Sequence, residues 1–79
     1  MRSIFHIIVK NKYLDNCSLG YAILALIGDS DLYYQEIRTT NWIFGYEIYD
    51  KSKIREFIEK IRIFNSQNNI QLGYEVINE

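Results

Sequence analysis

The sequence predicts an α+β domain with the element order βαββαβ, and three observations carry this prediction. The chain has 79 residues, which is enough for one hydrophobic core and therefore one domain, residues 1–79. Two segments, 17–27 and 51–65, repeat apolar residues at helical spacing. Four further segments are short and either β-branched or alternating with a period of two, which is typical of strands.

The first predicted strand covers residues 4–9. This run contains Ile, Phe, His and Val, and such an apolar, β-branched composition is typical of a central strand buried on both faces. Asn11 and Lys12 then break the pattern.

The first predicted helix covers residues 17–27. Its apolar residues recur at the spacing of one helix face and are Leu19, Ala22, Ile23, Leu26 and Ile27. Asp15 and Ser18 are candidate N-caps, and Gly28 suits the position that follows the helix. Residues 21–27 are also apolar enough for a strand, and that alternative would give a β-meander with one helix.

A hairpin and a second helix follow. Residues 32–40 and 42–49 are predicted to be its two strands, with a turn at Thr40-Asn41. The helix covers 51–65, begins at a cap supplied by Asp50 or Ser52, and carries one apolar stripe, formed by Ile54, Phe57, Ile58, Ile61 and Phe64.

The last predicted strand covers residues 70–76, where apolar and other residues alternate strictly. The complete order is that of the split βαβ, or ferredoxin-like, arrangement. We therefore expect a four-stranded antiparallel sheet with both helices on one face.

Strand parity predicts which sheet face the helices cover. Even positions of the third and fourth strands are apolar, whereas turning the third strand over would bury the carboxylate of Glu47. The opposite face should then be open and carry Ile77, together with Ile37 if the second strand follows odd parity. We predict a partner-binding surface on this face, formed by Tyr33, Ile43, Glu47, Tyr49, Gln71 and Glu75.

Composition excludes several function classes. The chain has one cysteine, Cys17, and one histidine, His6, so no zinc site, Cys pair or Ser-His-Asp triad can be assembled from it. We interpret His6 as a hydrogen-bonded packing residue, and we expect no enzyme activity, cofactor or metal. The apolar runs 4–9 and 19–27 are shorter than a signal-peptide core or a membrane span requires, so we expect a cytoplasmic protein without membrane contact.

The segment Trp42–Tyr49 resembles the second half of the aromatic third-strand segment of RNA recognition motifs. The resemblance implies that Phe44 and Tyr46 stack on the bases of single-stranded RNA, with help from Phe5. The chain departs from the family at Glu47, which stands where the family has a core residue, and the alternation of this strand directs both aromatics into the core instead. The net charge of −1 also supplies little attraction for phosphates.

A second resemblance concerns residues 24–31, which are similar, with a gap, to the LAGLIDADG helix of homing endonucleases. In that family the helix ends in a metal-binding acid, which would correspond to Asp29 or Asp31. We interpret both residues as loop and turn residues.

The predicted function is contact with another protein. Residues with A/T-rich codons (Ile, Asn, Lys, Tyr and Phe) supply 37 of the 79 positions, which indicates an AT-rich genome. Together with the small size and the neutral charge, this favours a non-enzymatic inhibitor or adaptor from a phage or mobile element, of the anti-defence (anti-CRISPR) type. The alternatives are a protein that binds single-stranded RNA and a self-associating structural protein, a homodimer with two open faces packed together.

Overall fold

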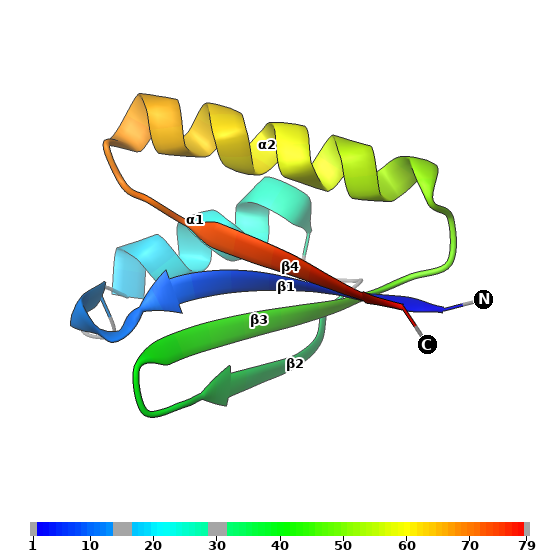
Figure 1. The fold of residues 1–79 in the computed structure, drawn as a ribbon. Helices are drawn as coiled ribbons and strands as arrows, with labels where there is room; N and C mark the ends of the chain where they lie inside the picture. Colours follow the sequence, from blue (N-terminus) through cyan, green and yellow to red (C-terminus); the bar gives the residue numbers. More distant parts are fainter. Residues whose placement is uncertain (1, 14–16, 29–31, 79) are drawn as a thin grey trace.

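The computed structural model describes residues 2–13, 17–28 and 32–78 (Figure 1). The strands are β1 (Ser3–Lys10), β2 (Leu32–Ile37), β3 (Asn41–Ile48) and β4 (Gly73–Asn78), and the helices are α1 (Cys17–Ile27), α2 (Ser52–Asn68) and the short 3₁₀ helix η1 (Asn11–Tyr13). The sheet order is β2-β3-β1-β4, with antiparallel neighbours throughout. The predicted α+β class and βαββαβ order are confirmed, and the meander with one helix is wrong.

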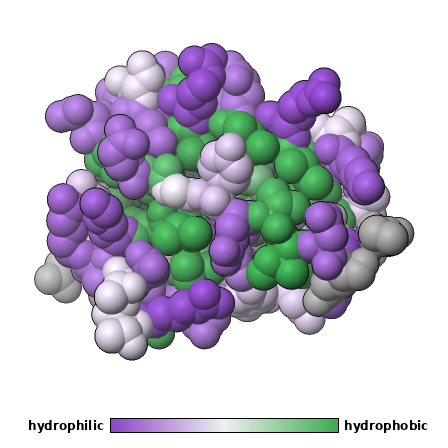
Figure 2. All heavy atoms as spheres, viewed as in Figure 1, coloured by the Kyte–Doolittle hydropathy of each residue, from purple (hydrophilic) through white to green (hydrophobic). Residues whose placement is uncertain are grey.

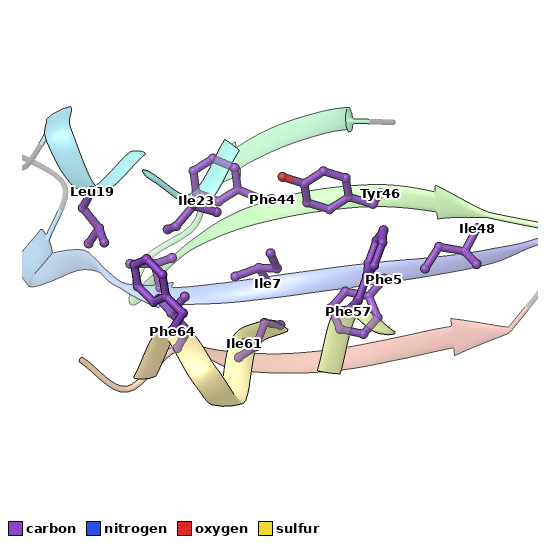
Figure 3. Close-up of a cluster of buried hydrophobic side chains, with 12 residues drawn as sticks. Phe5, Ile7, Leu19, Ile23, Phe44, Tyr46, Ile48, Phe57, Ile61 and Phe64 are labelled. Atoms are coloured by element: carbon purple, nitrogen blue, oxygen red, sulfur yellow. The ribbon is translucent and has the colours of Figure 1, made fainter. Parts of the chain in front are cut away.

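The core lies between one face of the sheet and the two helices, which both cover that face (Figures 1 and 3). Phe5 of β1 pairs with Tyr46 of β3 and Val76 of β4, so these side chains share this face. The rings of Phe5 and Phe57 from α2 meet edge to face with their centroids 5.3 Å apart. Even positions of β3 and β4 therefore face the helices, as parity predicted.

Helix α1 has the predicted bounds, and its close approach to the sheet depends on Gly20. A Cβ atom at this position would lie 2.9 Å from the tip of the Trp42 ring, so a larger residue would require the ring or the helix to shift. Gly28 follows the helix with a φ of 103°, and its N–H donates to the carbonyl of Leu24 at 2.8 Å. Ser18 lies within the helix and is not its cap, while Asp15 lies outside the described residues.

Helix α2 begins at Ser52, after a turn that Asp50 stabilises. The Asp50 carboxylate accepts hydrogen bonds from the Ser52 N–H at 3.0 Å and from its hydroxyl at 2.8 Å. The N-cap position itself is Lys51, which makes no side-chain cap bond, so the prediction that Asp50 or Ser52 caps the helix is wrong. The helix runs to Asn68, three residues beyond the predicted end, and stops where Asn69 adopts a left-handed conformation with a φ of 54°.

Strand β4 begins at Gly73, whereas the sequence predicted a start at residue 70. The cause is Asn65 of α2, whose side chain accepts a hydrogen bond from the Leu72 N–H at 2.9 Å and donates one to the Leu72 carbonyl at 3.1 Å. The backbone groups of Leu72 are thus occupied by a side chain of the helix.

Strand β2 is shorter than predicted, because the chain turns after Ile37. The Arg38 N–H donates to the Asn41 carbonyl at 2.7 Å, and the side chain of Asn11 donates to the carbonyls of Arg38 and Thr39. Asn41 is consequently the first residue of β3. Neither helix within the described ranges combines the length and apolar character needed to cross a membrane.

Candidate functional site on the open face of the sheet

The sheet face opposite the helices is called the open face here, and it carries the candidate site. The register places on it side chains from all four strands, namely Ile4, His6, Ile8, Tyr34, Glu36, Ile43, Gly45, Glu47, Glu75 and Ile77.

His6 is the centre of a hydrogen-bonded group of three side chains. It lies on the central strand β1 and is 2% exposed. Its Nδ1 is 2.7 Å from a carboxylate oxygen of Glu75 on β4, and its Nε2 contacts the hydroxyl of Tyr34 on β2. A neutral imidazole protonated at Nδ1 satisfies both partners, because it donates to Glu75 and accepts from Tyr34. The interpretation of His6 as a hydrogen-bonded packing residue is confirmed.

Tyr34 reaches His6 by crossing strand β3 at Gly45. Tyr34 pairs with Gly45 in the register, and a Cβ atom at Gly45 would lie 2.6 Å from two ring atoms of Tyr34. The glycine therefore provides the space in which the phenol ring lies against the sheet. One β2 side chain thereby connects the edge of the sheet to its centre.

A second group, called the tyrosine rim, consists of Arg2, Tyr33, Glu47 and Tyr49. Arg2 forms an ion pair with Glu47 at 3.1 Å and lies over the ring of Tyr33, 5.6 Å from its centroid. The Tyr49 hydroxyl donates to the same Glu47 carboxylate at 2.9 Å. This bond, followed by the charge of Glu47, raises the pKa of Tyr49 above its ordinary value because both favour the neutral phenol.

The two groups touch through Tyr33 and Tyr34, whose rings meet edge to face at 5.5 Å. This contact depends on a register shift between Leu32 and Tyr34, which leaves Tyr33 as an extra residue of β2. The open face therefore holds one continuous set of interacting side chains from Glu75 on one edge strand to the tyrosine rim.

The structure places the predicted contact residues in different settings. Tyr33, Glu47 and Tyr49 come together in the tyrosine rim, and Glu75 lies on the same face but is bound to His6. Gln71 was predicted to lie on the open face of the last strand. It is exposed, but it precedes β4 and is therefore not part of the sheet.

Two predicted members of the open surface are corrected. Ile43 has the expected parity but is only 1% exposed, since β3 is an inner strand and Ile43 is flanked by Ile8 of β1 and Glu36 of β2. Ile37 pairs with Trp42 and therefore belongs to the helix side of the sheet, because the register shift in β2 reverses the odd parity assumed for it.

Sequence reasoning missed the roles of Arg2 and Tyr34 on the open face. Tyr34 could have been found from Gly45, since a glycine inside a strand indicates a close approach by another group. Arg2 precedes the first strand and has no pattern that would reveal its contacts.

The residues suggested by family resemblances do not form sites on this face. Phe5, Phe44 and Tyr46 are fully buried in the core, so they are not available to stack on RNA bases. Asp29 and Asp31 lie outside the described residues. Within the described part of the chain, no three His, Cys, Asp or Glu side chains are grouped to hold a metal ion.

Comparisons with protein families, with curated proteins and with solved structures find no match to this chain.

Proposed function

We propose that this chain is a non-enzymatic protein-binding module whose contact surface is the tyrosine rim. The observation that supports this best is the exposure of two tyrosines that are held in place. Tyr33 is 53% exposed and Tyr49 is 70% exposed, yet Arg2 and Glu47 fix both by specific contacts. Tyrosine is enriched at the energetic centres of protein interfaces, and side chains that are already ordered lose less entropy on binding.

The hydrogen-bonded group around His6, which touches the rim through Tyr34, supports this role. Tyr34 and His6 tie β2 to β1 and give Tyr33 a fixed ring to pack against. The charges of Arg2 and Glu47 offset each other, and the chain has a net charge of −1. Such a surface offers aromatic area and directional hydrogen bonds more than a long-range charge, which suits a protein partner better than a polyanion.

Within this class we favour an inhibitor or adaptor of the anti-defence type that acts in the cytoplasm by occupying a surface of a host or defence-system protein. The support for this narrower proposal is the small size and the AT-rich composition of the chain.

The proposal is tested by using the protein to capture a partner from a bacterial lysate. Substitutions of two similarly exposed tyrosines, one in the rim and one outside it, serve as test and control. Tyr49 and Tyr21 are 70% and 74% exposed, but Tyr21 lies on α1, which covers the other face of the sheet. We expect Tyr49→Ala to lose a partner that wild type and Tyr21→Ala both retain. Equal recovery by Tyr49→Ala and wild type would show that the tyrosine rim is not the contact surface.

A further inference from the structure

The two edges of the sheet differ in how they are protected against pairing with another strand. Edge strand β2 contains the register shift between Leu32 and Tyr34, and it ends at an ion pair in which Glu36 and Arg38 lie 3.2 Å apart. Bulges and charged side chains are two devices that prevent further strands from pairing with an edge.

Edge strand β4 has no register shift, and it carries one charged residue. It pairs with β1 in an unbroken register from Gly73 to Asn78 and contains no Lys, Arg or Pro. Its single charged residue is Glu75, whose carboxylate is bound to His6 of β1. The outer edge of β4 therefore presents backbone groups in a regular register with no bulge to interrupt them.

Apolar side chains lie next to this edge on the face of the sheet that the helices cover. Figure 2 shows hydrophobic residues gathered over α2 and β4, the two elements nearest the viewer in Figure 1. Partly buried apolar residues that α2, β4 and their connection add to the core are Ile54, Ile58, Ile70 and Val76. Tyr74 of β4, stacked on Phe5 at 5.6 Å, is still 46% exposed. An added strand would cover part of this apolar surface.

We infer that the occupant of this edge is β4 of a second copy, paired antiparallel about a two-fold axis, so that the two sheets become one. The strand is complementary to itself, because its apolar Tyr74 and Val76 face the helix side, where the apolar surface of the other copy lies. The net charge of −1 per copy opposes association only weakly.

Two registers pair five residues of each β4, those centred on Glu75 and on Val76, whereas registers centred elsewhere on the strand pair three or fewer, and charge selects between these two. Opposite residues of an antiparallel pair have their side chains on the same face of the sheet. A two-fold axis must therefore pass between one residue and the same residue of the other copy, so that this residue pairs with itself. A register centred on Glu75 would set two carboxylates opposite each other, which is destabilising. A register centred on Val76 pairs Val76 with itself and places each Glu75 opposite Ile77 of the other copy. The dimer therefore uses the Val76 register.

This dimer does not depend on the proposed function. Strands β2 and β4 lie at opposite edges of the sheet, so pairing through β4 leaves Tyr33 of β2 exposed in both copies. It also differs from packing of two open faces, which would cover the tyrosine rim.

Light scattering across a range of concentrations tests the dimer, with two charge variants at one position. Ile77 is 42% exposed, and in the Val76 register it faces Glu75 of the other copy. Ile77→Glu should therefore create two repulsive pairs, and Ile77→Lys two attractive ones. Because each dimer contains two such cross-strand charge pairs, we expect the dimer dissociation constants of the two variants to differ by about tenfold. Circular dichroism of each variant checks that it is folded.

The control is Ile37→Lys on the other edge, where a residue that is 68% exposed receives the same charge. The inference holds if wild type and Ile37→Lys form dimers of equal affinity and Ile77→Glu dissociates more readily than Ile77→Lys. It is overturned if the wild type is monomeric at all concentrations, if Ile37→Lys disrupts the dimer, or if the two Ile77 variants dissociate equally.

Discussion

At the scale of single residues, Gly45 and Tyr34 depend on each other. Gly45→Ala would place a Cβ atom 2.6 Å from the Tyr34 ring and force the ring away from His6. We expect a loss of about 1–3 kcal/mol in the free energy of unfolding, the usual cost of overpacking. Urea denaturation of the variant and the wild type measures this difference.

The same substitution made in a Tyr34→Ala variant shows whether the Tyr34 ring causes this loss of stability. In Tyr34→Ala the ring is absent, so Gly45→Ala should cost much less there than in the wild type. If Gly45→Ala costs the same in both backgrounds, the close packing of these two residues is not what requires the glycine.

Glu47 controls the ionisation of Tyr49. The hydrogen bond from the phenol to this carboxylate raises the pKa of Tyr49, so Glu47→Gln should lower it towards the ordinary value of 10.0. A raised pKa in the folded state means that the associated stability is present below pH 10 and is lost as pH rises through the raised pKa. Nuclear magnetic resonance titration of a labelled Tyr49 ring in both proteins measures the change. An identical titration in both would exclude Glu47 as the cause.

At the scale of elements, Asn65 determines how the chain passes from α2 to β4. Asn65→Ala leaves the buried N–H and carbonyl of Leu72 without these partners, and we expect a loss of about 1–3 kcal/mol. The exposed neighbour Ser66 supplies a control, since Ser66→Ala should change stability by about 0.5 kcal/mol or less. Thermal unfolding of both variants compares them, and equal losses would contradict this role of Asn65.

The start of α2 should be sensitive to acid through Asp50. The hydrogen bonds from the Ser52 hydroxyl and N–H lower the pKa of Asp50 below its ordinary value of 3.8. A lowered pKa in the folded state stabilises the protein above the unfolded value, and this stabilisation disappears as pH falls below about 3.8. Asp50→Ala should therefore unfold at a lower temperature than wild type at pH 7, and this gap should narrow at pH 3. A gap that is constant or widens towards low pH would contradict the assignment.

The elements themselves and the bounds of α1 could be predicted from the sequence, whereas the end of β2 and the start of β4 depend on distant contacts. The apolar stripe that includes Phe57 and Ile61 is a local pattern, and it located α2 directly. The start of β4, by contrast, is set by the bonds between Asn65 and Leu72. Such side-chain bonds to the backbone leave no periodicity in the sequence.

At the scale of the whole molecule, strand parity predicted which face of the sheet is open but not what fills it. The alternation around Glu47 assigned β3 correctly, and Tyr33, Glu47 and Tyr49 are indeed neighbours there. The parity of β2 could not be predicted, because the register shift before Tyr34 has no clear sequence signal. For the same reason the connection from Tyr34 to His6 appears only in the folded chain.

We propose that the open face binds a protein partner through the tyrosine rim. The most direct test is the affinity of the captured partner for three proteins: wild type, Tyr49→Ala and Tyr21→Ala. We predict that Tyr49→Ala weakens binding by about tenfold or more, as expected for an interface hot spot, and that Tyr21→Ala binds within about twofold of wild type. A partner that binds Tyr49→Ala as tightly as wild type, or is lost with Tyr21→Ala, would contradict the claim.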